Sequence, residues 1–285
     1  MGTGMLALPE IEVLRRNLEK EVVGRRVKGA EIRPGSNAMK MIPRHGRRKE
    51  FQELLEGAKI QRADRMGTRL VLELDNLHAL VFSLGSTARL LKTSASDELE
   101  AHTHVVISFT IGGQLRLLDV KRTGEVFVAR QDELKALPGM ADFALDPLES
   151  SLTWHHFSQM LEQKDRPMKA LLLDGTFITG LGDVYSDEIL FGAGLRHDHP
   201  SGGLSSQDVR RLYRTLTEIL FDALKARGTS TPESEFVDLY GQAGTYQLEL
   251  KVFGRNGESC RRCRHEILRE KIEDVWAYFC PHCQA

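Results

Sequence analysis

The chain opens with an amphipathic pattern that predicts a helix over residues 9–23. Apolar side chains recur there at helical spacing, at Ile11, Leu14, Leu18 and Val22. Arginine, lysine and glutamate fill the opposite side of the same helix. One face of this helix is therefore expected to pack against a core, while the other meets solvent.

The next hundred residues carry short runs typical of β-strands, divided by turn signals such as Asp75-Asn76 and Gly112-Gly113. No helix separates most of these runs, which favours an antiparallel sandwich or barrel. The runs predict strands at residues 27–34, 59–66, 69–75, 78–84, 102–110, 114–120 and 125–129.

Beyond residue 131 the pattern becomes helical. Ser205 or Ser206 is a suitable N-cap for the longest of these helices, and Gly228 ends it. A loop rich in Gly, Thr, Ser and Glu follows at 228–246. The change of pattern predicts domains at 1–135 and 148–246 and a terminal module at 247–285. Helices are expected at 132–137, 153–163, 168–175, 184–194 and 205–228.

Composition narrows the class of protein. The 285 residues are 41% hydrophobic and 28% charged, with a net charge of −1, which is ordinary for a soluble globular protein. No apolar run approaches the roughly 20 residues that span a bilayer, and the N-terminus lacks the features of a signal peptide. We therefore expect a cytoplasmic protein without a membrane partner.

All four cysteines lie in the last 26 residues, as two C-x2-C pairs. Each pair suits a tight turn that directs both thiolates at one ion, and four thiolates complete a closed tetrahedral zinc site. The alternatives are two disulfides or four unrelated thiols. The spacing favours one structural zinc ion, bound by Cys260, Cys263, Cys280 and Cys283.

The cysteine module is basic. Six cations crowd the 17 residues from 255 to 271, and on a small hairpin they would offer a positive face to phosphates. A solvated surface or a protein-binding ribbon is the alternative. The six are Arg255, Arg261, Arg262, Arg264, Arg269 and Lys271.

Three segments together resemble the formamidopyrimidine-DNA glycosylase and endonuclease VIII family. Residues 8–16, LPEIEVLRR, look like the opening helix of that family. Residues 169–191 look like its helix-two-turn-helix segment, and residues 252–283 look like its zinc finger. Order and spacing are kept, and the similarity runs from about residue 6 to residue 284.

This resemblance implies an α+β fold: an N-terminal antiparallel β-sandwich, a helical helix-two-turn-helix domain and a C-terminal four-cysteine zinc ribbon. It also implies binding of duplex DNA, with a damaged base flipped out of the stack. In the family an N-terminal proline amine attacks the sugar C1′ to form a Schiff base, and the next glutamate moves protons.

The sequence departs from the family at these reactive positions. Leu6 and Ala7 stand where the proline and the glutamate are expected, and Thr68 stands where the catalytic lysine is expected. None of these side chains offers an amine or a carboxylate. Further departures are Ser86, Lys121 and Thr123 at positions that fill the DNA void, Asp183 at a phosphate-binding asparagine, and Val275 at the arginine of the finger.

Other positions match, so contact with DNA stays the expectation. If Met1 is removed, the amine of Gly2 is an alternative nucleophile, although it lies on a longer arm than the family's proline and no glutamate adjoins it. The catalytic residue is otherwise unknown. The expected DNA-binding residues are Lys169, Tyr185, Lys121, Arg122, Arg255, Arg261 and Arg262.

Four histidines outside the cysteine module are weaker candidates. His102 and His104 lie two apart at the start of a strand, and two histidines alone make a poor metal site. His197 and His199 are expected at the surface.

Two functions of different class stay open. The first is a DNA-repair type protein that binds duplex DNA, damaged or abasic DNA included, without the Schiff-base chemistry of the family. The second is an active DNA glycosylase and abasic-site lyase that uses other residues, such as Gly2. Since function follows the site rather than the fold, the missing amine and carboxylate favour the binding protein. It is expected to be monomeric and associated with the nucleoid.

Overall fold

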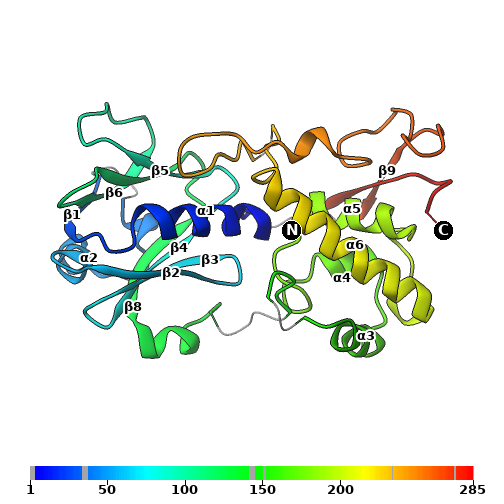
Figure 1. The fold of residues 1–285 in the computed structure, drawn as a ribbon, viewed down its shortest axis with the longest axis horizontal. Coiled ribbons are helices and arrows are strands. Elements are labelled where there is room, and N and C mark those ends of the chain that lie inside the picture. The colour runs from blue at the N-terminus through cyan, green and yellow to red at the C-terminus, as the bar shows by residue number, and fades with distance from the viewer. Residues whose placement is uncertain are drawn as a thin grey trace. The chain divides into compact units, whose positions relative to one another are not determined.

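The computed structural model describes residues 4–33, 38–140, 145–149, 152–232, 234–272 and 274–284. The described residues form two compact units (Figure 1). We call those within 4–141 and 227–245 the sandwich unit, and those within 142–226 and 246–285 the helical unit. The segment 227–245 thus packs with a part of the chain that is far from it in sequence.

Helix α1, Leu8–Glu21, starts the sandwich unit and confirms the first predicted element. Pro9 lies in its first turn, where a missing N–H costs no hydrogen bond. The apolar positions Ile11, Leu14 and Leu18 are fully buried, and the helix packs on strands β2 and β3. The periodicity of the sequence therefore identified the buried face correctly.

Eight strands form two four-stranded antiparallel sheets in this unit. One sheet has the order β1 (Val27–Ile32), β6 (Thr103–Phe109), β7 (Gln114–Asp119) and β5 (Ala88–Thr93). The other has the order β2 (Ile60–Met66), β3 (Arg69–Leu74), β4 (His78–Ser83) and β8 (Glu125–Arg130). The predicted α+β class with antiparallel sheets is confirmed.

Two local predictions were incomplete. Strand β5 was not predicted, because its sequence ARLLKT is poor in β-branched residues and it is held in the sheet by its register with β7. The helix expected at 132–137 is the 3-10 helix η2, Gln131–Ala136. The remaining elements of the unit are η1, Ala38–Met41, and α2, Arg48–Leu55.

The helical unit contains α3 (Trp154–Glu162), α4 (Met168–Leu172), α5 (Gly182–Ala193), η3 (Ser201–Gly203), α6 (Ser206–Lys225) and η4 (Tyr246–Leu248). It ends in a two-stranded antiparallel hairpin of β9 (Leu268–Ile272) and β10 (Val275–Phe279). The predicted helices at 153–163, 168–175, 184–194 and 205–228 correspond to α3, α4, α5 and α6. Within the described residues, no helix has the length and apolarity that a membrane span requires.

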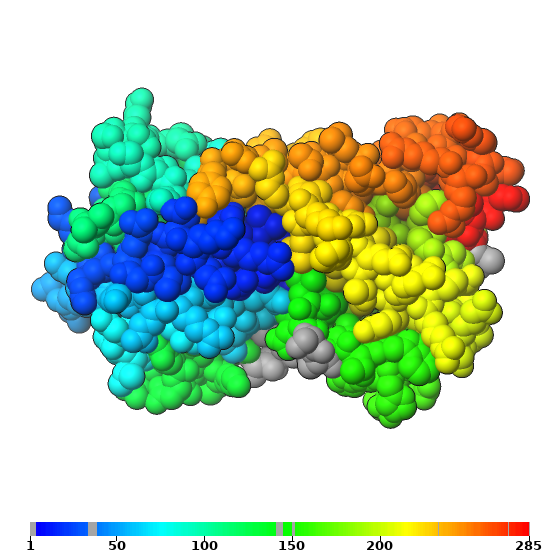
Figure 2. All heavy atoms as spheres, in the orientation of Figure 1, coloured from blue at the N-terminus to red at the C-terminus, as the bar shows by residue number. Residues whose placement is uncertain are grey.

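Helix α6 begins as its sequence predicts. The Ser205 hydroxyl accepts a hydrogen bond from Asp208 N at 3.2 Å, and Asp208 Oδ2 accepts one from Ser205 N at 3.1 Å, which completes a capping box. Helix α6 packs closely on α5. A Cβ atom added at Gly192 of α5 would overlap the methyl group of Thr215 on α6, so only glycine fits at this contact. One side of α6 is open to solvent, as Figure 2 shows in yellow.

Candidate functional site

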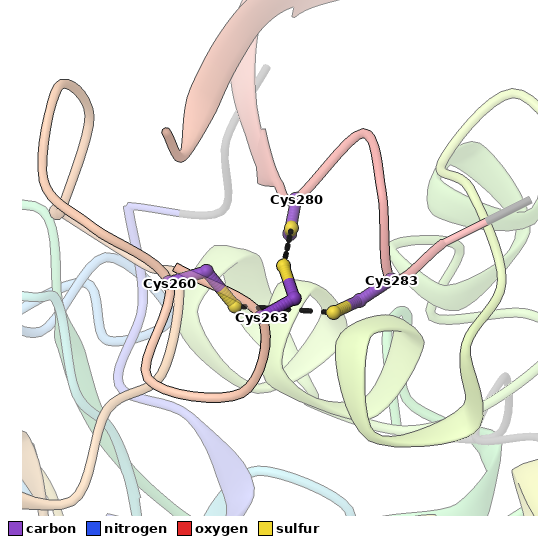
Figure 3. Close-up of side chains that lie close together, drawn as sticks. All are labelled: Cys260, Cys263, Cys280 and Cys283. Atoms are coloured by element: carbon purple, nitrogen blue, oxygen red, sulfur yellow. Dashed lines mark hydrogen bonds between the residues drawn. The ribbon is translucent and has the colours of Figure 1, made fainter. Parts of the chain in front are cut away.

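The four cysteines come together in the helical unit, and their sulfur atoms converge on one point (Figure 3). All four sulfurs lie within 4.8 Å of one another. Cys260 Sγ is 3.9 Å from Cys283 Sγ, and Cys263 Sγ is 3.4 Å from Cys280 Sγ. These separations are far longer than the roughly 2.05 Å of a disulfide bond, so the thiols are free.

This geometry fits a metal ion. Four ligands at about 2.3 Å in a tetrahedron place their sulfurs about 3.8 Å apart, close to the separations found here. The thiols also resist joint ionisation without a cation. Although burial opposes it, the N–H groups of Cys263 and Arg262 lower the pKa of Cys260 to about 7. Burial and the adjacent thiols raise the pKa of Cys283 to about 12. A bound cation would remove this conflict.

Backbone hydrogen bonds shape the two turns that carry the cysteines. In the first turn, Cys260 N donates to His265 O at 2.7 Å and Arg264 N donates to Cys260 O at 2.9 Å. In the second turn, Gln284 N donates to Cys280 O at 3.1 Å. The amide group of Gln284 also accepts from Cys280 N and donates to Leu195 O. The second turn is therefore fixed to the chain just after α5.

Helix α5 holds one end of the ribbon through Glu188. The two carboxylate oxygens of this buried side chain accept hydrogen bonds from three consecutive amides, those of Lys251, Val252 and Phe253, at 2.8–2.9 Å. Burial raises the pKa of Glu188, while the three amide donors favour its ionised form. Glu188 therefore orients the segment that leads into the first cysteine turn.

The preceding residue of α5 holds the other end of the ribbon. Asp187 Oδ2 accepts from Tyr278 N at 3.0 Å, and Asp187 Oδ1 accepts from Lys169 Nζ at 2.8 Å. Burial raises the pKa of Asp187 to about 7, against the Lys169 ammonium, which lowers it. We expect an ionised pair, since both carboxylate oxygens have donors.

Lys169 and Tyr185, both expected at the DNA surface, lie inside the helical unit. Lys169 is 0% exposed, and its ammonium also donates to Ser186 Oγ at 2.9 Å and to Asp183 O at 3.0 Å. Tyr185 is 1% exposed and its ring lies 5.9 Å from that of Tyr246. In this conformation Lys169 presents no ammonium to a phosphate, because its three N–H donors are used within the protein. Its role in binding DNA stays a prediction that this geometry does not favour.

The three arginines expected to bind DNA differ in how they are used. Arg255 holds its own loop together: it pairs with Glu258 at 2.9 Å and donates to Lys251 O and Ser259 O. Arg261 and Arg262 are exposed at the first cysteine turn. The Arg262 guanidinium lies 4.4 Å from the centre of the Phe191 ring, so α5 orients it.

Lys121 and Arg122 lie in the sandwich unit, on the loop between β7 and β8. Asp119 shapes this loop by accepting from Gly124 N at 2.9 Å and from Thr87 Oγ1 at 3.0 Å. Any Cβ at Gly85 would overlap the Thr123 hydroxyl, so the loop packs tightly on the segment after β4. Lys121 is exposed, and Arg122 adopts a left-handed backbone with a φ of 54°.

The chain just before α1 is paired with the segment after β4 and presents no amine. Leu6 N donates to Leu84 O at 3.1 Å, and Ser86 N donates to Gly4 O at 2.8 Å. The Leu6 side chain is buried at 3% exposure. Position 6 is therefore an ordinary buried peptide unit. Gly2, the alternative nucleophile, lies outside the described residues.

The other two reactive positions also offer no titratable group. Ala7 is the N-cap of α1, where it forms no side-chain hydrogen bond, and Thr68 lies in the turn between β2 and β3. The nearby Glu10 has a structural contact, since its Oε1 accepts from Thr229 N at 2.7 Å. Glu10 thereby attaches the segment 227–245 to α1.

The histidines that the sequence singled out lie in different environments. His197 was expected at the surface, but it is 2% exposed and its ring lies 4.7 Å from that of Phe279. That prediction was wrong because the ribbon, which is distant in sequence, covers it. His104 is buried, and its Nε2 is 2.8 Å from Asp119 O. Among the described residues, the cysteines are the group of metal-ligating side chains that come together.

Comparison with known proteins gives consistent matches across the chain. Residues 5–126 match the model of the formamidopyrimidine-DNA glycosylase N-terminal domain, and residues 143–234 match that of the formamidopyrimidine-DNA glycosylase H2TH domain. A formamidopyrimidine-DNA glycosylase of Pelotomaculum thermopropionicum is 33% identical over 98% of this chain and 99% of its own. One from Heliobacterium modesticaldum is 34% identical over 98% of this chain and its own full length.

Two solved structures are similar over nearly the whole chain. The MutM (Fpg) protein of Thermus thermophilus has a TM-score of 0.85 at 30% identity, covering 98% of both chains. Lactococcus lactis Fpg, solved in complex with DNA that contains an abasic site, has a TM-score of 0.87 at 28% identity, covering 98% of this chain and 99% of that one.

Proposed function

The chain belongs to the formamidopyrimidine-DNA glycosylase family, and we propose that it binds duplex DNA, damaged or abasic DNA included, without the Schiff-base chemistry of that family. The complex of Lactococcus lactis Fpg with abasic DNA supports the choice of partner, because its fold is shared over nearly the full chain. The proposal on chemistry rests on the residues of this chain.

The observation that supports this proposal most directly is the peptide nitrogen of Leu6. Schiff-base formation needs a neutral amine with a free electron pair, and Leu6 N is a peptide nitrogen that donates to Leu84 O. A peptide nitrogen has no basic electron pair to attack a sugar carbon. Ala7 and Thr68 also lack a group that could take up a proton or replace the amine.

We further propose that the four cysteines hold one structural zinc ion. A set of four thiolates in a tetrahedron is typical of zinc, and it leaves no open coordination position for water or substrate. The ion would supply folding energy to the ribbon and fix the first cysteine turn. That turn carries Arg261 and Arg262, whose exposed guanidinium groups suit phosphate oxygens.

The cations that we propose as phosphate contacts are exposed rather than buried. Arg261 and Arg262 extend from the helical unit, and Lys121 extends from the sandwich unit. Each phosphate contact should contribute about 0.9 to the slope of log affinity against log salt concentration. Replacing Arg261 by Ala should therefore reduce that slope by about one unit, with Arg130→Ala as a control, because the exposed Arg130 guanidinium already pairs with Asp132 at 2.9 Å.

The experiment that tests the proposal combines binding with trapping. The zinc-loaded full-length protein is incubated with a duplex that contains one abasic site, and borohydride is added to reduce any Schiff base to a stable adduct. We expect salt-dependent binding and no adduct, while a formamidopyrimidine-DNA glycosylase with an N-terminal proline gives the adduct in parallel. Release of free bases from a panel of damaged duplexes is measured with the same preparation.

Two outcomes would contradict the proposal. Absence of DNA binding at low ionic strength would remove the partner, and release of a damaged base would establish glycosylase activity. An adduct that disappears when the N-terminal amine is acetylated would favour the second candidate, a lyase that uses Gly2. That candidate has one supporting observation: Gly4 and Met5 are held against residues 85–86, so the arm starts from a fixed point. The monomeric state and the nucleoid association stay predictions.

A further inference from the structure

The hairpin of β9 and β10 exposes a tryptophan between two cations. Trp276 is 41% exposed, which is unusual for the largest apolar side chain in a small module. The Arg269 guanidinium lies 4.4 Å from the centre of its ring. Lys271 is the direct cross-strand partner of Trp276 in the register of the hairpin.

Alternation along the strands places these side chains on one face. Arg269, Lys271, Trp276 and Tyr278 form this hairpin face, because Lys271 pairs with Trp276 and Arg269 pairs with Tyr278. Ala277 and Phe279 point to the opposite, buried face. Neither Arg269 nor Lys271 has an ion-pair partner among the residues that the structure describes. The hairpin face thus combines two unpaired cations with an exposed indole ring.

We propose that Trp276 is a stacking platform for an unpaired base, so that this protein prefers DNA in which a base face is exposed, such as a gap or a single-stranded segment. Arg269 covers one face of the indole ring and orients it, and the exposed part of the ring is available to a base. Arg269 and Lys271 neutralise the adjacent phosphates. Aromatic rings next to cations are the usual means of holding single-stranded nucleic acid.

This inference rests on the proposed function, since it names the DNA structure that the ribbon would prefer. A continuous duplex offers base edges in its grooves but no base faces, except at its ends. Cations alone would bind paired and unpaired DNA through phosphates with little discrimination. The indole ring is therefore the feature that predicts a preference.

The experiment uses the zinc-loaded full-length protein and two probes of equal length. One is a covalently closed circular duplex, which has neither ends nor loops of unpaired bases, and the other is the same circle with a one-nucleotide gap. The chain contains two tryptophans, so the W154F variant leaves Trp276 as the indole reporter. We expect its fluorescence to be quenched by the gapped probe and to change little with the closed one.

Affinity measurements on variants complete the test. Trp276→Ala should weaken binding to the gapped circle about 5- to 150-fold, the range typical of one base stacked on an aromatic ring, and should leave binding to the closed circle nearly unaffected. Trp276→Phe should retain part of the preference. Phe221→Ala is the matched control, since Phe221 is 57% exposed and lies 4.4 Å from the Lys225 ammonium on α6. It should change neither affinity.

Failure of the stacking platform can be distinguished from failure of the proposed function. If Trp276→Ala keeps its fold and metal content and binds both probes as the parent does, the stacking platform is wrong while the proposed function stands. Equal losses for both probes would also overturn it, because they would indicate a general contact. If the parent binds neither probe at low salt, both the inference and the proposed function are wrong.

Discussion

Two regions of the molecule, the start of α1 in the sandwich unit and the cysteine ribbon in the helical unit, are both fixed by buried carboxylates. In α1, Glu10 accepts from Thr229 N, and Glu12 receives hydrogen bonds from three arginines. In α5, Asp187 and Glu188 accept four backbone amides of the ribbon. The anchoring principle is the same, since a buried carboxylate is costly unless donors hydrogen-bond to it.

The two regions differ in the residues that these buried carboxylates, here called anchors, hold in place. The ribbon anchors hold four thiols whose separations suit one metal ion. The α1 anchors hold a segment in which Leu6 and Ala7 carry no titratable group. This difference shows that a chain can keep the structural acids of a site independently of its reactive atoms. It also means that similarity of fold supports the scaffold more directly than it supports the chemistry.

Removing one cysteine ligand should change the protein most, because the metal is then lost. Cys280→Ser removes one thiolate and leaves three ligands, so the ribbon should lose its metal and its ordered hairpin, because metal binding supplies about 10–16 kcal/mol in zinc-finger peptides. We expect about one zinc per chain in the parent and little in the variant, measured by atomic emission, and DNA affinity should fall at least tenfold.

The control for this variant is Ser259→Ala, one residue before the first ligand. Ser259 is exposed and its side chain is no metal ligand, so metal content and affinity should be unchanged. Parent-like zinc content in Cys280→Ser would show that the four sulfurs do not act as one site. Unchanged DNA affinity after metal loss would show that the ribbon does not take part in binding.

The second effect concerns the buried pair of α4 and α5. Lys169→Met keeps the length of the side chain but leaves the Asp187 carboxylate without its cation. Removing one partner of a buried ion pair leaves the other charge unpaired and typically costs about 3–5 kcal/mol of stability. The free energy of unfolding from urea titration should fall by that amount. The loss should be greatest at high pH, because a carboxyl with a raised pKa is protonated, and so less costly to bury, in acid.

Two further variants test whether the unpaired charge causes this loss of stability. Lys49→Met removes an exposed ammonium that lies 3.4 Å from the Glu53 carboxylate, and it should change stability by less than about 0.5 kcal/mol. The double variant K169M with D187N should recover part of the loss, since the stranded charge is gone. A stable Lys169→Met protein with weakened DNA binding would instead support Lys169 as a phosphate ligand.

The sequence predicted the parts of this structure that depend on local pattern. The buried face of α1, the cap at Ser205 and the convergence of four cysteines all follow from spacing, because helix period, capping and metal turns are local. The family resemblance added the α+β class, with antiparallel sheets, a helical domain and a four-cysteine cluster at the C-terminus. Strand β5 was missed because it depends on a partner strand.

Burial set by distant segments could not be predicted in the same way. His197 appeared polar and accessible in sequence, yet Phe279, which follows it by 82 positions, packs on its ring. Lys169 looked like a cation for DNA, but its partner Asp187 reaches it only through the packing of α4 on α5. The exposure of Trp276 could not be predicted from the sequence either, since a tryptophan in a short strand is usually part of a core.

The smallest expected effect tests the anchor in α1. Glu12 lies among Arg15, Arg16 and Arg65, and although burial opposes it, their hydrogen bonds keep the pKa of Glu12 below its usual 4.5. A carboxylate with a depressed pKa stabilises the fold above pH 4.5, and this stabilisation is lost as the pH falls through the lowered value. Glu12→Gln should therefore cost about 1–3 kcal/mol at neutral pH, measured by urea titration, and the deficit should shrink steadily below pH 4.5. Glu19→Gln is the matched control, because Glu19 is 59% exposed and pairs with Arg15 at 2.9 Å, so its loss should stay below about 0.5 kcal/mol. A deficit for Glu12→Gln that does not change with pH would show that the shape of the side chain, rather than its charge, anchors α1.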